Sequence, residues 1–402
     1  MGTLDNTDPL IQEKVEQATK LLNLHNIDLW LIFTQETGYE CDSIYPLLMG
    51  DRDIARGYLL LTRQGGKIAI VGGLDQAIPG STGVWEDVRI YTKNANELLL
   101  EILAETNPST IAINYSQNNS LADGLTYGKY LSLTEALKDT PFAGRLVSAE
   151  KLAAGLRSVK SPEEINKIKV AISKTDEVFR RLRAYLRPGL GGMEIFGFIQ
   201  EQITTLGAAS AWSRYNCPVL TIGPVQYMGH TPPPADRKLE KGWLLQVDLG
   251  LRFDGYCSDF QRMFYALADG EDGPPGEVLS LFQNVHDGIT DMINAIKPSV
   301  PNDYPSSLGF ARITGHGFPE PKYSAGHQLG RAVHDGGAGL INFRTPRPEC
   351  LIEEGNVFTV EGLETRLDNY GWVSLEEDVA VTAEGCQVLT DRQNEIYCIK
   401  NR

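Results

Sequence analysis

Cysteine is scarce in this sequence, with six residues in 402 and no Cys-x-x-Cys pair. Such sparse cysteines exclude a disulfide framework and zinc-finger spacing, and they favour a reducing compartment. A signal peptide would need a basic segment before an apolar one, whereas the first residues here are polar. We therefore expect a cytoplasmic protein.

Clustered basic residues and long apolar runs are also missing. Lys and Arg number 37 against 52 Asp and Glu, which gives a formal net charge of −15. A phosphate-binding surface needs grouped Lys and Arg, so we expect no nucleic acid partner. The most apolar early stretch, residues 21–33, is interrupted by His25, Asn26 and Asp28 and is too short to span a bilayer, so no membrane association is expected.

Several catalytic signatures are absent as well. The sequence has no Gly-x-Ser-x-Gly elbow. Residues 124–129 faintly resemble a phosphate loop, but their spacing is wrong and Tyr130 follows in place of Ser or Thr. Gly72-Gly73 lacks the dinucleotide-binding fingerprint.

Length and pattern predict two domains, because a single core stops growing at roughly 250–300 residues. In the first, residues 1–155, strands and helices alternate, which indicates an α/β domain. The predicted strands are 28–33, 57–62, 67–71 and 110–114, and the predicted helices are 10–24 and 96–106.

The second domain, residues 156–402, opens with a helix signal. Ser161-Pro162-Glu163-Glu164 is a capping box with proline at the first helical position, and it predicts a helix over 162–186. The remainder is typical of an α+β domain. It has predicted helices over 192–206 and 276–296 and strand-rich regions at 243–251, 256–266, 357–363 and 372–382.

The first of two predicted hairpins carries a pair of aspartates. Strand alternation places Asp248 on the face opposite the neighbouring apolar residues. If the turn is centred between Phe253 and Asp254, Asp248 lies directly opposite Asp259. If the turn is Asp254-Gly255, the two are diagonal neighbours. In either case they share a face, with Cβ atoms about 5–8 Å apart.

The second hairpin repeats the arrangement with Glu361 and Glu376, which are symmetric about Asp368-Asn369. Like charges so placed repel unless one takes up a proton or a cation lies between them. Either pair alone would be interpreted as ordinary surface acids. Two pairs in one domain are harder to dismiss in this way, and a metal site is the alternative interpretation.

Histidine is rare, with six residues in the chain. His230, His327 and His334 fall near the acidic hairpins, and His327 is preceded by a glycine that permits close backbone approach. A lone histidine is more often a hydrogen-bonded structural residue than a ligand. His316, between two glycines, is interpreted as a structural or loop residue.

Five residues in order resemble the ligands of the pita-bread metallopeptidases, a family that includes methionine aminopeptidase, aminopeptidase P, prolidase and the metal-free creatinase. The residues are Asp248, Asp259, His327, Glu361 and Glu376. The spacings from His230 to Asp248 and from His327 to His334 also match. Residues 157–165 resemble the linker-to-helix segment of the prolidase, aminopeptidase P and creatinase branch. The resemblance implies a pita-bread catalytic domain preceded by a smaller creatinase-like α/β domain.

The resemblance further implies two divalent metal ions. Manganese is the first expectation, with cobalt, iron or zinc as alternatives, because the ligands are mostly hard oxygen donors. Asp259 and Glu376 would bridge the ions, Asp248 would complete one, and His327 with Glu361 would complete the other.

The activity implied is that of an Xaa-Pro dipeptidase or aminopeptidase, with a short proline-containing peptide as substrate and a homodimer as assembly. Glu361 would also carry a proton, while His230 and His334 would hold the substrate and stabilise the oxyanion. A metal-independent creatinase-like hydrolase and a non-catalytic partner-binding relative are the alternatives. Both typically lose ligands, and all five are present here.

Some positions depart from the family pattern without removing a ligand. Gly362-Leu363 follows Glu361 where Pro-Gly is usual, and Asp335-Gly336-Gly337 follows His334. Ser374 stands where prolidases and aminopeptidases P usually have arginine, which bears on how strictly proline is required.

Three further residues near the acids remain open to interpretation. Glu377 is an alternative ligand to Glu376, although the hairpin symmetry favours Glu376. Gln246 and Arg262 are candidates for orienting the acids, and Gln246 is at least as readily an ordinary strand residue.

Overall fold

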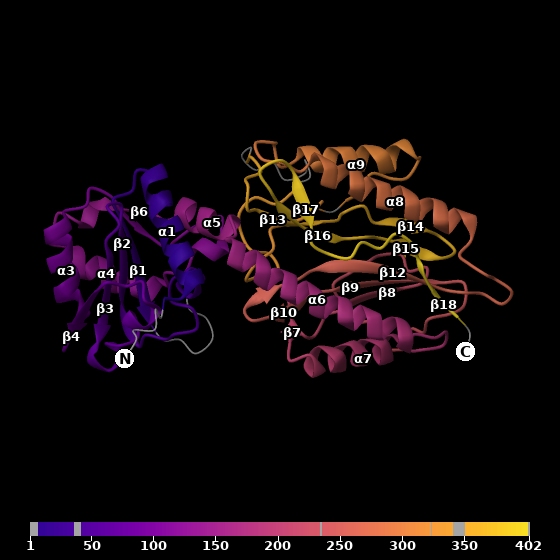
Figure 1. The fold of residues 1–402 in the computed structure, drawn as a ribbon, viewed down its shortest axis with the longest axis horizontal. Coiled ribbons are helices and arrows are strands. Elements are labelled where there is room, and N and C mark those ends of the chain that lie inside the picture. Colours follow the sequence, from indigo (N-terminus) through magenta and orange to yellow (C-terminus); the bar gives the residue numbers. More distant parts are fainter. Residues whose placement is uncertain (1–6, 36–41, 234, 323, 341–349, 401–402) are drawn as a thin grey trace. The chain divides into compact units, whose positions relative to one another are not determined.

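The computed structural model forms two compact units, Met1–Arg157 and Ser158–Arg402 (Figure 1). Each unit has hydrophobic clusters of its own. The residues described are 7–35, 42–233, 235–322, 324–340 and 350–400.

The first unit is built on a six-stranded mixed sheet with the strand order β4-β3-β2-β1-β5-β6. β1 pairs antiparallel with β2 and parallel with β5, so the sheet combines a meander with crossover connections. The strands are β1 (Leu29–Gln35), β2 (Arg56–Thr62), β3 (Lys67–Gly72), β4 (Asp87–Tyr91), β5 (Ile111–Ile113) and β6 (Leu146–Ser148).

Helices cover both faces of this sheet because its strands are apolar on both sides. Along β1, Trp30 and Ile32 join one buried cluster, whereas Leu29 and Leu31 join another. The first cluster includes residues of α1 (Pro9–Leu24), α2 (Tyr45–Met49) and α5 (Glu150–Ser158), and the second includes residues of α3 (Ala95–Thr106) and α4 (Tyr127–Leu137). The predicted α/β alternation is present, although α2, α4 and α5 were not predicted.

The second unit places strands between two pairs of helices (Figure 1). α8 and α9 lie on one side of the strands and α6 and α7 on the other. The four helices are α6 (Pro162–Tyr185), α7 (Gly192–Thr205), α8 (Gly276–Ala295) and α9 (Tyr304–Gly315).

The strands of the second unit form four small sheets, ordered β18-β12-β9-β8, β11-β10-β7, β13-β16-β17 and β14-β15. Their bounds are β7 (Ala209–Ser210), β8 (Val219–Ile222), β9 (Leu244–Leu249), β10 (Leu251–Phe253), β11 (Tyr256–Cys257), β12 (Phe260–Ala266), β13 (Val357–Val360), β14 (Thr365–Leu367), β15 (Gly371–Val373), β16 (Glu377–Val381), β17 (Cys386–Val388) and β18 (Tyr397–Ile399).

Local signals set the start of α6. The Ser161 hydroxyl accepts a hydrogen bond from the Glu164 amide at 3.3 Å, and the Glu164 carboxylate accepts one from the Ser161 amide at 2.9 Å. The predicted capping box is therefore confirmed. Helix α9 was not predicted, because its twelve residues include two glycines and form only a short apolar face.

Breaks in the predicted strands fall beside the acidic residues. Region 243–251 divides at Gly250 into β9 and β10, and region 256–266 divides at Asp259 into β11 and β12. A Cβ atom on Gly250 would lie 2.4 Å from the Ser258 carbonyl oxygen, so only glycine permits this close approach.

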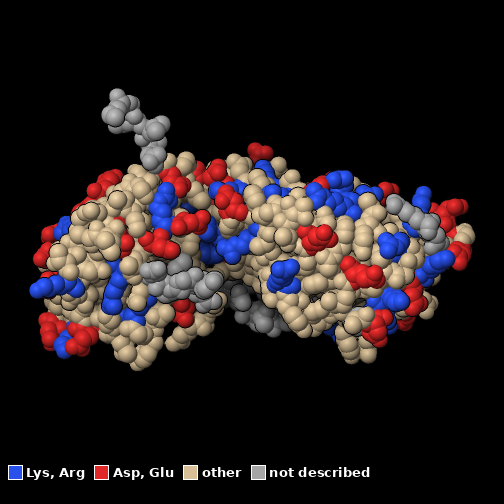
Figure 2. Space-filling view, turned by 90° about the horizontal axis from the view of Figure 1, so that it is seen from below, with Lys and Arg blue, Asp and Glu red and all other residues tan. Residues whose placement is uncertain are grey.

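The surface charges and the cysteines of the described residues give little further information about function. Basic and acidic side chains are interspersed over the face shown in Figure 2. Within the described residues, no helix combines the length and apolarity needed to cross a membrane. Cys41 lies outside the described residues, and the other cysteines are free thiols.

Candidate metal centre

The first acidic pair adopts the diagonal arrangement. β9 and β12 pair antiparallel with Asp248 opposite Gln261, which places Asp259 two residues from the directly facing position. Arg252 pairs with Cys257 in the same register, so the turn is Asp254-Gly255. Both turn residues have positive φ, +48° and +79°, as a tight hairpin of this type requires.

The second pair lies just beyond the last rungs of a ladder. Val360 of β13 pairs with Glu377 of β16, and continuing that register places Glu361 opposite Glu376. Glu376 is 1% exposed. The Glu377 carboxylate accepts hydrogen bonds from Arg262 and Thr390, so it is occupied elsewhere. This contact favours Glu376 over Glu377 as the ligand.

His327 is held between the two pairs by the backbone of β13. The His327 amide donates to the Thr359 hydroxyl at 3.2 Å, and the Thr359 amide donates to the His327 carbonyl at 3.0 Å. Its ring Nδ1 lies 3.3 Å from the Gln328 carbonyl oxygen, a contact that favours a proton on Nδ1. Nε2 then presents a lone pair, 3.6 Å from Asp259 Oδ2 and 3.7 Å from Glu361 Oε1.

One cavity of about 500 Å³ gathers the predicted site residues. Potential ligand atoms of Asp259, His327 and Glu376 all lie within 4.8 Å of one another. All seven predicted site residues line this cavity: His230, Asp248, Asp259, His327, His334, Glu361 and Glu376.

Burial and like charge shift the protonation of these groups. Burial raises the pKa of Asp248 to about 7. Burial, followed by the charge of neighbouring carboxylates, raises the pKa values of Asp259, Glu361 and Glu376 well above their usual range. Burial and the nearby His334 lower the pKa of His327 to about 3, so its imidazole is neutral at physiological pH.

The cluster fits a cation because several of its oxygens lack any other partner. Asp248 Oδ1, Asp259 Oδ1 and Glu376 Oε1 are each buried without a hydrogen bond. An unpaired buried carboxylate oxygen is costly, and a bound cation removes that cost. Carboxylate oxygens with one neutral imidazole suit divalent transition metals.

The two remaining histidines lie beside this cluster. The rings of His327 and His334 meet edge to face, with centroids 4.3 Å apart. Burial and His230 lower the pKa of His334. The Asn216 side chain donates to the His230 carbonyl at 3.0 Å, which anchors the His230 backbone.

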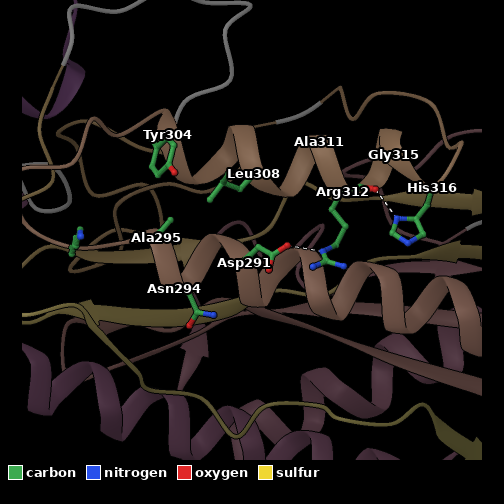
Figure 3. Close-up of a pocket in the computed structure, with 10 residues that line it drawn as sticks. Asp291, Asn294, Ala295, Tyr304, Leu308, Ala311, Arg312, Gly315 and His316 are labelled. Atoms are coloured by element: carbon green, nitrogen blue, oxygen red, sulfur yellow. Dashed lines mark hydrogen bonds and ion pairs between the residues drawn. The ribbon is translucent and has the colours of Figure 1, made fainter.

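His316 lies in a different place, as expected of a structural residue. It follows α9 and lines a groove between α8 and α9, where its Nδ1 lies 2.9 Å from the Arg312 carbonyl oxygen (Figure 3). In the same groove the Arg312 guanidinium contacts Asp291 at 2.6 Å.

Of the two candidates for orienting the acids, neither contacts a ligand carboxylate directly. Arg262 donates to the backbone carbonyl of Glu376 at 3.0 Å and to the side chain of Glu377. Gln246 donates to Gln261 at 3.0 Å, and Gln261 in turn donates to Glu361 at 3.2 Å.

Sequence reasoning missed Gln261 and Glu364, which also line the cavity. Gln261 could have been found from the diagonal register, because it faces Asp248 across the hairpin. Glu364 had no such signal, since its position three residues after Glu361 has meaning only once the loop is folded.

Comparisons with solved structures identify the fold. An Xaa-Pro dipeptidase from Bacillus anthracis superposes with a TM-score of 0.74 at 21% identity, covering 97% of this chain and 100% of that one. A prolidase from Pyrococcus horikoshii gives 0.69 at 20% identity, covering 96% and 99%. The expected α+β pita-bread fold with a preceding α/β part is confirmed.

Sequence comparisons agree with the fold. An uncharacterized peptidase of Bacillus subtilis (YqhT) is 28% identical over 279 residues, 69% of this chain and 73% of that protein. An uncharacterized peptidase of Staphylococcus aureus is 30% identical over 237 residues, 58% and 63% of the two chains. The family model for metallopeptidase family M24 matches residues 166–383. This chain belongs to metallopeptidase family M24.

Proposed function

We propose that this chain is a dinuclear-metal exopeptidase that hydrolyses the bond between an N-terminal residue and proline. The supporting observation is the set of unpartnered buried oxygens on Asp248, Asp259 and Glu376, in a cavity that a neutral His327 also lines. Among structures that share the fold, those named Xaa-Pro dipeptidase and prolidase support the choice of substrate.

In this proposal the ligands divide between two ions. Asp259 and Glu376 would contribute to both ions, Asp248 would complete one, and His327 with Glu361 would complete the other. Manganese is the proposed metal, with cobalt, iron or zinc able to occupy the same donors. Bound divalent ions supply Lewis-acid polarisation of the scissile carbonyl and lower the pKa of the attacking water.

The surrounding residues handle protons and substrate. The Glu361 carboxylate accepts the proton released by the attacking water and passes it to the leaving proline nitrogen. A neutral His334 keeps one ring N–H, which donates to the carbonyl oxygen as charge develops there. His230, on the same cavity wall, holds the peptide beside it.

The proposal extends to location and assembly. We propose a cytoplasmic homodimer that acts on short peptides, with no nucleic acid or membrane partner. Native mass spectrometry counts the chains directly, and a single chain at all concentrations would contradict the dimer.

Chelation tests the activity. Metal-stripped protein should lose hydrolysis of Ala-Pro, and added Mn²⁺ should restore it, because the four acids and His327 act only through the ions. Ala-Ala serves as the control peptide, and a longer peptide with proline second separates dipeptidase from aminopeptidase activity. The ratio of Ala-Pro to Ala-Ala hydrolysis then measures how strictly proline is required in a chain that carries Ser374.

Two outcomes would contradict this activity. Full Ala-Pro hydrolysis by the stripped protein would indicate a metal-independent, creatinase-like hydrolase. Failure to hydrolyse any proline peptide with metal bound would indicate another substrate or a non-catalytic protein.

A further inference from the structure

Three buried polar side chains form a hydrogen-bonded chain that ends on Glu361. Gln246, Gln261 and Ser374 are 1%, 3% and 0% exposed. The Ser374 hydroxyl donates to Gln261 Oε1 at 2.6 Å, and Gln246 Nε2 donates to the same oxygen at 3.0 Å. Gln261 Nε2 then donates to Glu361 Oε2 at 3.2 Å.

The partners determine which way the Gln261 amide faces. As a metal ligand Glu361 is ionised, and an ionised carboxylate only accepts hydrogen bonds, so the amide must present its nitrogen to Glu361. Its oxygen then faces Gln246 and Ser374, both of which can donate. Turning the amide over would set two acceptors against each other in a buried site, which costs free energy.

This contact gives the two oxygens of Glu361 different surroundings. Oε2 is held by the amide, whereas Oε1 lies 3.7 Å from His327 Nε2, on the side of the proposed ion. The donor is neutral, so it brings no positive charge that would compete with a cation for Glu361. Metal ligands held by such a hydrogen bond are already oriented before the ion arrives.

We propose that Gln261 is a positioning residue, locked by Gln246 and Ser374, that holds Glu361 with Oε1 directed at the metal site. The inference rests on the proposed dinuclear function. It also explains the serine at position 374, where the family resemblance would place an arginine. A hydroxyl suffices at position 374 because it needs only to donate a hydrogen bond to the Gln261 oxygen.

Metal affinity tests this role without requiring activity. Metal-stripped wild type and Gln261→Leu are titrated with Mn²⁺ by calorimetry, and Gln261→Leu should bind one Mn²⁺ about 10-fold more weakly or worse. Gln261→Glu keeps the shape and, at a pH where the added carboxylate is ionised, presents only acceptors to Glu361, so it should weaken binding of the same ion there. Ser374→Ala should cause a smaller loss of Mn²⁺ affinity. Because it is the smaller change, it still tests the role of Gln261 if the Gln261 variants misfold.

Gln393→Leu is the matched control. Gln393 is also a buried glutamine, but its amide bonds only the backbone of Met263, at 2.7 Å each way. This variant should lose stability and keep wild-type Mn²⁺ affinity.

Four results would overturn the inference. If Gln261→Glu binds Mn²⁺ as tightly as wild type, Gln261 acts by packing alone. If Gln393→Leu weakens binding as much as Gln261→Leu, the effect is general destabilisation. If the wild type binds no Mn²⁺, the proposed function itself fails. If the wild type binds two ions and the variants bind them equally well, only the proposed role of Gln261 fails.

Discussion

One acid that lines the cavity, Glu364, belongs to neither of the two hairpin pairs. Its Oε2 is buried without a hydrogen bond. Burial, with the charge of Asp248, raises the pKa of Glu364 to about 7. Glu364 therefore adds an unfavourable charge to the metal-free cavity at neutral pH.

Replacing Glu364 by glutamine should stabilise the metal-free protein in a pH-dependent way. The folded state holds the Glu364 proton up to about pH 7, whereas an unfolded glutamate releases it near pH 4.5. The unfolded state thus binds fewer protons between these values, and stability is lost as the pH rises through this window. Glu364→Gln should raise Tm at pH 8 and change it little at pH 4.

Thermal unfolding of metal-stripped samples at both pH values checks this prediction. Asp272→Asn, at an exposed acid, provides the baseline for a neutralised surface charge. A gain of equal size at pH 4 and pH 8 would show that the charge of Glu364 is not the cause.

At the scale of elements, the sequence predicted which segments form hairpins and left the first register open. The positive φ values at Asp254 and Gly255 selected the diagonal alternative. Alternation and capping residues identified α6 and the strands, since these are local signals. The strand break at Gly250 involves close contacts with Ala211 and Trp212, which lie far back in the chain and which no local pattern reports.

Gly326 also lies in close contact with backbone far along the chain, and alanine at this position should displace His327. Its φ is +144°, and a Cβ atom would lie 2.0 Å from the Thr359 carbonyl oxygen. Gly326→Ala should cost at least about 1–3 kcal/mol of stability through backbone strain. It should also lower Mn²⁺ binding, because His327 is the next residue.

Urea unfolding and bound-metal analysis measure both effects. Gly385→Ala is the control, since a Cβ atom there meets nothing within 4 Å. Normal metal content in a destabilised Gly326→Ala would show that His327 is positioned independently of this contact.

At the scale of the whole molecule, the site collects residues from far apart in the chain. Asp248 and Glu376 are separated by more than a hundred positions, yet both line one cavity. Residue order and family resemblance predicted these donors, because the chemistry of a metal site restricts residue type. Neutral neighbours of the donors such as Trp212 could not be predicted, since many side chains can line a cavity.

At this scale the comparisons show the fold and the family, whereas the substrate is a proposal. The match to the family covers residues 166–383, within the second unit, whereas the structural neighbours cover nearly the whole chain. The first unit carries none of the proposed ligands. The proposed activity therefore requires that the second unit hold two ions.

Metal counting by native mass spectrometry tests that claim most directly. Metal-stripped protein titrated with Mn²⁺ should reach two ions per chain, and Asp259→Asn should lose both, because Asp259 is the proposed shared ligand. Asp254→Asn, in the exposed turn of the same hairpin, should keep two. A wild-type chain that binds no Mn²⁺, or an Asp259→Asn variant that still holds two ions, would contradict the account.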